Sequence, residues 1–303
     1  MAIIEFIQQF SNPFLDWFFR IITEAGDAIF FILVGAILYW VIDKKFAFKL
    51  MVSFLFSALI NGAIKQFTNK PRPYQEGAKP ILQETTGSSM PSGHSQGIGA
   101  LGSMMIYEYY EIKWLRWLSV ALMILVPFSR MYLGQHYLED VTVGLVLGIV
   151  LGLLGLFLLS VGNPDKEDIR ALYLVPVFIL LMIFVQNEQL YVAGGAYIGL
   201  TIGYFIEKRY VRYDNKELWW IHVLKVIFGL VIAFALKEGL KPLFSLFYNN
   251  NQTIEYIFDA IRYMLIALWA SLGSMFVFKK ALRIDDKPRF VCAKQKEETN
   301  QVA

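Results

Sequence analysis

Long apolar runs recur along the whole chain, and they constrain its fold more than any other feature. Several runs reach the length of about 18 residues that a helix needs to cross a bilayer. Hydrophobic residues make up 56% of the 303 residues and charged residues 17%, whereas a soluble domain carries about 25% charged residues. These values exclude a water-soluble globular protein, a disordered chain and a disulfide-stapled secreted domain. The sequence predicts an all-α fold, a polytopic transmembrane helical bundle.

The apolar runs predict about nine membrane spans. Residues 1–24 come first and hold two shorter apolar segments, the second starting at Pro13, which we expect to be interfacial helices. The spans are expected at about 25–42, 47–67, 94–110, 114–130, 137–161, 170–187, 189–206, 218–238 and 256–278.

The distribution of Lys and Arg predicts the orientation of the chain in a cell membrane. If the N-terminus is outside, 18 of the 28 cationic residues fall in inside segments, which is the bias that the positive-inside rule describes. We therefore expect the N-terminus outside and the C-terminus in the cytoplasm. The net charge of +3 is too small to indicate nucleic acid as a partner, and the single cysteine, Cys292, excludes an internal disulfide.

Five cationic residues lie on the predicted outer side and break this rule. They are Lys65, Lys70, Arg72, Lys79 and Arg130. Four of them flank or lie in a polar stretch rich in Pro, Gly and Ser, at about 68–92, and a loop of this length in a compact bundle is often functional. We expect Lys70 and Lys79 to be solvated loop charges and the other three to serve a site.

Three short motifs lie at the outer ends of predicted spans two to five. The first runs from Lys65 to Pro73 and reads KQFTNKPRP; the second, at 91–94, is PSGH. The third runs from Ser129 to Asp140 and reads SRMYLGQHYLED. Ionisable groups in or beside a membrane are costly, so they are candidates for a functional site by default.

The residue types in these motifs suit the chemistry of a phosphate group. Arg offers a planar fork of donors and Lys a point charge, so the three outer cations can surround one phosphate. We expect Ser92 to be an N-cap, and Gly93 allows close approach to the N–H groups of a helix N-terminus, which bind anions. His136 and Asp140 are spaced i, i+4 and share one helix face. One histidine is then available to attack phosphorus, and another to protonate the leaving oxygen.

The three motifs together resemble those of the type-2 phosphatidic acid phosphatase superfamily, which is related to vanadium haloperoxidases. The resemblance covers roughly residues 45–160 and implies a metal-independent phosphatase, without a cofactor, that works through a phosphohistidine intermediate. It implies that His136 is the nucleophile, Asp140 its orienting partner and His94 the general acid. The residues that would hold the phosphoryl oxygens are Lys65, Arg72, Ser92, Gly93 and Arg130.

The resemblance and the spans predict four parts in the chain. Residues 1–24 form the interfacial helices, 25–162 a phosphatase core of about five spans, 163–280 an additional four-span bundle and 281–303 a cytoplasmic tail. Nine spans, with the site and the N-terminus on the same side, are similar in topology to glucose-6-phosphatase.

Some polar and small residues outside the motifs have structural interpretations. A stripe of Gly144, Gly148 and Gly152 predicts close helix–helix packing. Asp259 and Arg262 are spaced i, i+3 and are expected to pair, and we expect His222 to be structural.

The function predicted from the sequence is hydrolysis of a phosphomonoester or diphosphate at an outward-facing site. Lipid phosphates such as phosphatidic acid or an isoprenoid diphosphate are the expected substrates, and the lipid bilayer is the expected partner. Two alternatives stay open: a phosphatase for soluble sugar phosphates of the glucose-6-phosphatase type, and a non-catalytic transporter or scaffold that binds phosphate or lipid. The sequence leaves the oligomeric state open.

Overall fold

The computed structural model describes residues 1–82, 85–214, 218–248 and 251–281, and within these ranges the chain forms helices and no strand. The predicted all-α class is therefore confirmed. The predicted cytoplasmic tail at 281–303 lies, beyond Ala281, outside the described residues.

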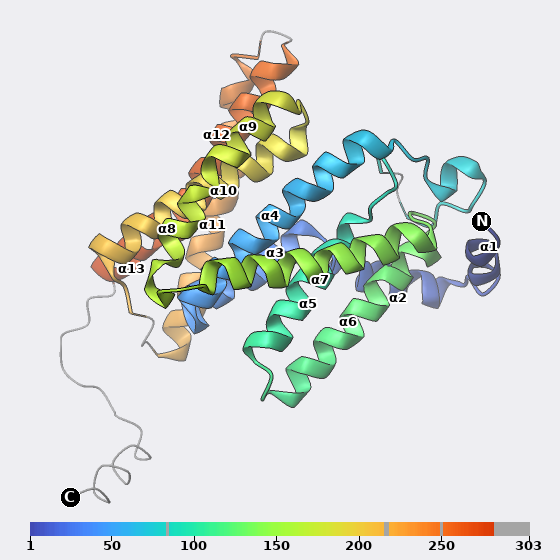
Figure 1. Cartoon of the computed structure of the whole chain (residues 1–303), viewed down its shortest axis with the longest axis horizontal. Coiled ribbons are helices and arrows are strands. Elements are labelled where there is room, and N and C mark those ends of the chain that lie inside the picture. Colours follow the sequence, from blue (N-terminus) through green and yellow to red (C-terminus); the bar gives the residue numbers. More distant parts are fainter. Residues whose placement is uncertain (83–84, 215–217, 249–250, 282–303) are drawn as a thin grey trace, which may run out of the picture.

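The helices follow one another with short connections, apart from the polar stretch between η2 and α5 (Figure 1). In chain order they are α1 Ala2–Gln8, α2 Pro13–Glu24, α3 Ala28–Ile37, η1 Leu38–Ile42, α4 Lys44–Thr68, η2 Pro73–Glu76, α5 Gly93–Glu108, α6 Lys113–Tyr132, α7 Leu138–Ser160, η3 Pro164–Lys166, α8 Glu167–Tyr173, α9 Val175–Phe184, α10 Glu188–Ile206, η4 Glu207–Val211, α11 Trp219–Ser245, α12 Gln252–Leu268, η5 Trp269–Gly273 and α13 Ser274–Ala281.

Six of these helices are long and apolar enough to cross a membrane, and a seventh span results if α2 and the segment Ala28–Ile42, bent by 51°, count as one. The predicted spans at 25–42, 94–110 and 170–187 fall on shorter helices. The helix α5 has 16 residues, and the last of the three stretches is broken at Leu174 between α8 and α9. Apolar content does not reveal such breaks, so the number of nine spans and the orientation remain predictions.

Side-chain caps set the starts of several helices. Asn12 accepts hydrogen bonds from the backbone N–H groups of Phe14 and Leu15, with Pro13 in the first turn of α2 as predicted. Asp43 caps α4, and Ser92 caps α5 by accepting from Ser95 N at 3.4 Å. A capped start fixes where each helix begins and hence which side chains lie at its end.

The predicted glycine stripe on α7 is confirmed as a packing surface. A Cβ built on Gly148 would lie 2.0 Å from the carbonyl oxygen of Gln96 on α5. A Cβ on Gly144 would meet the Ser92 carbonyl oxygen at 2.5 Å, and one on Gly152 the Ala100 Cα at 2.9 Å. Glycine therefore lets the two helix backbones approach along three turns, and it brings the first turn of α5 beside the first turn of α7.

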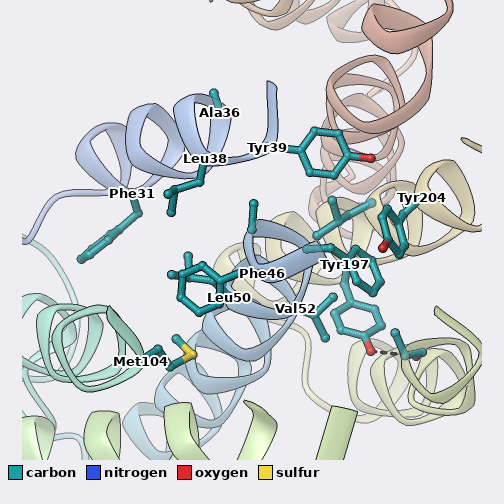
Figure 2. Close-up of a cluster of buried hydrophobic side chains, with 14 of the residues drawn as sticks. Phe31, Ala36, Leu38, Tyr39, Phe46, Leu50, Val52, Met104, Tyr197 and Tyr204 are labelled. Carbon is teal, nitrogen blue, oxygen red and sulfur yellow. Dashed lines mark hydrogen bonds between the residues drawn. The ribbon is translucent and has the colours of Figure 1, made fainter. Parts of the chain in front are cut away.

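Buried aromatic side chains join the α3–α7 part of the chain to the α10–α13 part. Figure 2 shows Val52 of α4 on the side of Tyr197 of α10, whereas Phe46 and Leu50 lie on the other face of α4, toward Met104 of α5. The ring of Tyr204 also stacks on Phe48, with ring centroids 3.8 Å apart. Through these contacts α4 packs against both groups of helices.

Ion pairs reinforce this junction near the start of α4. Lys44 Nζ lies 2.8 Å from the buried carboxylate of Glu207, and Lys208 Nζ lies 2.9 Å from that of Glu167. Farther along the chain, Arg262 and Asp259 pair at 2.7 Å as predicted.

We predict that Gly148→Ala destabilises the protein, because the added Cβ has no room between α7 and α5. Overpacking of this kind costs about 1–3 kcal/mol, which lowers the thermal midpoint in detergent. Gly239→Ala is the matched control, since nothing lies within 4 Å of a Cβ at Gly239 on α11. Replacing a glycine inside a helix by alanine removes a helix-weakening residue, so this variant should have the same thermal midpoint as wild type or a slightly higher one. Equal midpoints for the two variants would contradict the packing argument.

Candidate active site

The structure brings the three sequence motifs together at one end of the α4–α7 helices. The first motif closes α4, the second opens α5, and the third links the end of α6 to the start of α7 (Figure 1). A hydrogen bond of 3.0 Å from Ser92 N to Asp140 O joins the second motif to the third. Residues more than 60 positions apart thus share one site.

His136 and Asp140 lie side by side, but a serine hydroxyl connects them. The distance from His136 Nδ1 to Asp140 Oδ2 is 3.9 Å, which is too long for a hydrogen bond. Ser89 Oγ lies between, 3.3 Å from His136 Nδ1 and 2.5 Å from Asp140 Oδ2. Asp140 Oδ2 also accepts from Tyr137 N at 2.9 Å, and Lys70 Nζ lies 2.8 Å from Oδ1.

Arg72 faces the other nitrogen of the same imidazole. Its Nη1 lies 3.4 Å from His136 Nε2, and its side chain is 97% buried. Three other N–H donors of the guanidinium bind the backbone carbonyls of Thr86, Gly87 and Gln135 at 3.1–3.3 Å. The polar loop therefore holds the fork of Arg72 in a fixed orientation beside the imidazole.

Arg130 is buried at the end of α6, where the N-terminal segment contacts it. Its Nη1 donates to Thr23 Oγ1 at 3.1 Å, and among the described residues its Nε has no hydrogen-bond partner. Gly26, three residues after Thr23, lies against His94, because a Cβ at Gly26 would be 2.8 Å from His94 Cβ. The end of α2 and the turn after it thus line the site, next to the Arg130 Nε that lacks a partner among the described residues.

The electrostatic environment keeps the His136 imidazole neutral. Burial, and to a smaller extent the positive charges of Arg130, Arg72 and Lys65, lower the pKa of His136 to about 3 against the opposing effect of Asp140. His136 lies in the turn before α7 and is 98% buried. A neutral imidazole surrounded by three cations has a free lone pair and a strong preference for anions nearby.

The first turn of α5 offers fewer free donors than the sequence suggested. The backbone N–H of Ser92 is bound to Asp140 O, and its Oγ accepts from both Ser95 N and Ser95 Oγ. Ser92 is left with its hydroxyl hydrogen, and the half-buried Gly93 with its N–H, to bind an anion.

Lys70 corrects an expectation from the sequence. We expected a solvated loop charge, but its Nζ binds both Asp140 and Glu139, the latter at 2.6 Å, and lies 4.6 Å from the centre of the Tyr137 ring. Its place in the polar loop two residues before Arg72 was the only signal in the sequence. Lys79, by contrast, is exposed as expected.

Two further residues at the site were missed by sequence reasoning. Ser89 lies in the polar loop close to the PSGH motif, which was a weak signal. Thr23 carries no signal, because it belongs to a segment that has no motif and lies more than 100 residues from Arg130.

The arrangement can bind a tetrahedral anion next to a neutral imidazole. Lys65, Arg72 and Arg130 supply positive charge, and the first turn of α5 supplies N–H and O–H donors. Among the described residues, no group of three or more His, Cys, Asp and Glu is placed to hold a metal ion.

Several known proteins are similar in sequence to parts of this chain. The chain is 24% identical over 238 residues to lipid phosphate phosphatase delta of Arabidopsis thaliana, covering 69% of this chain and 56% of that protein. It is 28% identical over 161 residues to a probable sphingosine-1-phosphate phosphatase of Dictyostelium discoideum, covering 49% and 40%. It is 35% identical over 162 residues to dolichyldiphosphatase of Saccharomyces cerevisiae, covering 48% and 63%. The chain spans about half the length of the curated relatives that it matches.

Two family profiles match successive parts of the chain. The profile described as the PAP2 superfamily matches residues 46–162. The profile described as the transmembrane extension of PAP2 superfamily phosphatases matches residues 191–285. Together they account for most of the sequence, and the chain belongs to the PAP2 superfamily of membrane phosphatases.

Proposed function

We propose that the protein is an integral membrane phosphatase that hydrolyses a lipid phosphomonoester or diphosphate. The observation that carries this proposal is the position of the buried His136 imidazole, with Nε2 beside the Arg72 fork and within the field of Lys65 and Arg130. A site that only binds phosphate needs the cations. A nucleophilic histidine with a carboxylate close to its other ring nitrogen is needed only for catalysis.

The proposed reaction proceeds in two steps. The lone pair of His136 Nε2 attacks phosphorus, the bond from phosphorus to the leaving oxygen breaks, and His94 donates a proton to that oxygen. Water then attacks the phosphohistidine, its proton passes to His94, and the P–N bond breaks to release phosphate. No metal ion or cofactor takes part in either step.

The proposed phosphate-binding groups stabilise the transition state by their charge and their donors. Arg72 is held by backbone carbonyls and Arg130 by Thr23, so neither must reorient when the phosphoryl group becomes pentacoordinate. The full set is Lys65, Arg72, Ser92, Gly93 and Arg130.

The names of the relatives and the surface near the site favour a lipid substrate. The relatives are named as phosphatases of lipid phosphates, sphingosine-1-phosphate and dolichyl diphosphate. Beside the site, α1 and α2 expose the aromatic side chains of Phe6, Phe14 and Trp17, as interfacial helices do. The bias of Lys and Arg supports a site on the extracytoplasmic face of the cell membrane. In this proposal residues 25–162 form the catalytic core, and residues 163–280 form an additional helix bundle.

We predict that His136→Ala and His94→Ala each abolish phosphate release. The experiment compares purified wild type and variants in detergent on phosphatidic acid, an isoprenoid diphosphate, a sphingoid-base phosphate and glucose 6-phosphate. His222→Ala is the matched control, because this histidine belongs to none of the three motifs. Full activity in either site variant would overturn the mechanism. Release from glucose 6-phosphate alone would replace the lipid assignment, and phosphate binding without release would leave a transporter or scaffold.

We predict that activity survives EDTA and falls with vanadate. Vanadate adopts the pentacoordinate geometry of the phosphoryl group in the transition state, and the Lys65–Arg72–Arg130 cluster should hold it. Initial rates of phosphate release, with each reagent titrated separately, make the measurement. Abolition by EDTA and restoration by a divalent cation would contradict the metal-free mechanism.

We predict that acid destabilises the wild type more than His136→Gln. The folded pKa of His136, about 3, lies below the value of about 6.5 for an unfolded histidine. Below pH 6.5 the unfolded chain binds a proton that the folded chain does not, so this contribution to stability is complete above pH 6.5 and is lost as pH falls toward 3. Thermal midpoints at pH 7 and pH 4.5 test the point: an equal drop in both proteins would refute it.

A further inference from the structure

The connection between His136 and Asp140 passes through Ser89. Although the two residues are spaced i, i+4, α7 begins only at Leu138, so His136 lies in the turn before the helix. The imidazole therefore stands 3.9 Å from the carboxylate instead of bonding to it. Ser89 Oγ fills the gap, at 3.3 Å from Nδ1 and 2.5 Å from Oδ2.

The donors and acceptors in this chain determine where each hydrogen lies. Asp140 is an acceptor, so the single hydrogen of the Ser89 hydroxyl points to Oδ2. Ser89 Oγ can then only accept from His136, which requires a hydrogen on Nδ1. On the opposite side, Arg72 has only donors, so Nε2 must carry the lone pair. Both ends of the imidazole thus require the same tautomer.

The surroundings hold Ser89 in place for this contact. Its side chain is fully buried, and its backbone N–H donates to Lys70 O at 2.9 Å. The Lys70 side chain and Tyr137 N bind the Asp140 carboxylate from other directions. The polar loop therefore positions the hydroxyl, and α7 positions the carboxylate that receives its hydrogen.

We propose that Ser89 is a positioning residue that holds His136 in the Nδ1–H tautomer and couples it to the charge of Asp140. When Nε2 forms its bond to phosphorus, Nδ1 keeps its hydrogen and the ring becomes positively charged. The Ser89 hydroxyl then accepts a stronger hydrogen bond from Nδ1 while donating to Asp140. The inference rests on the proposed function for its effect on rate, but its structural part does not.

The tautomer is tested first, by histidine-selective ¹⁵N NMR of the full chain in detergent. The chain has three histidines, so the His136 signals are assigned by their loss in His136→Gln. In wild type, Nδ1 should show the shift of a protonated nitrogen and Nε2 that of an unprotonated one. Ser89→Ala should shift the Nδ1 signal of His136, because the hydrogen on Nδ1 loses its hydroxyl acceptor, whereas Ser103→Ala, which removes a buried serine that donates to a carbonyl within α5, should not. An unchanged His136 spectrum in Ser89→Ala would overturn the proposal.

The coupling is tested by a double-mutant cycle on phosphate release. Ser89→Ala should lower kcat about tenfold, the factor that one ordinary hydrogen bond is worth, with KM little changed. In the Asp140→Asn background, the same substitution should lower kcat by less than twofold, because the partner of the hydroxyl is altered. Equal effects in the two backgrounds would overturn the coupling.

Two comparisons separate this inference from a folding defect and from the proposed function. Ser89→Thr keeps the hydroxyl and should recover most of the kcat lost in Ser89→Ala; a Thr variant that folds like wild type but is no faster than the Ala variant counts against Ser89. Wild-type release that His136→Ala does not reduce would overturn the proposed function instead, and the NMR result would still decide the tautomer.

Discussion

The close approach of α5 and α7 is the constraint on which the rest of the site depends. The three glycines of α7 leave no side chain between the two backbones, and Ser92 N reaches Asp140 O across the interface. Two motifs that lie on separate helices therefore share one end of the bundle. A bulkier residue at Gly148 would separate the helices and move the first turn of α5 away from His136.

Several buried cations lie at the end of the helices that holds the site, and hydrogen bonds and carboxylates offset most of the cost of burying them. Arg72 binds three backbone carbonyls, and Lys70 binds two carboxylates. Arg130 has Thr23 as a partner, but within the described part of the chain its Nε has none. A buried cation that lacks a full set of partners is costly on its own, and an incoming phosphate would offset this cost. The site is thus arranged for an anion.

The α10–α13 helices are joined to the α3–α7 helices along α4. The stacking of Phe48 on Tyr204 and the pair of Lys44 with Glu207 lie toward the start of α4, whereas Lys65 and the polar loop lie at its other end. These contacts fix the orientation of α4. The N-terminal segment reaches the site directly, since Thr23 binds Arg130 and the turn after α2 lies against His94, although both precede the part that matches the PAP2 profile.

The sequence by itself determined the all-α membrane fold, the family and the cluster of motifs, because apolar run length, residue type and spacing are local properties. The same local reasoning foresaw the cap at Ser92 and the packing role of Gly148. Only the tertiary structure decided that Lys70 binds Asp140, that Ser89 separates Asp140 from His136, and that Thr23 holds Arg130. Each of these contacts depends on where a loop or a helix start lies relative to a distant element. No spacing rule along the chain encodes that distance.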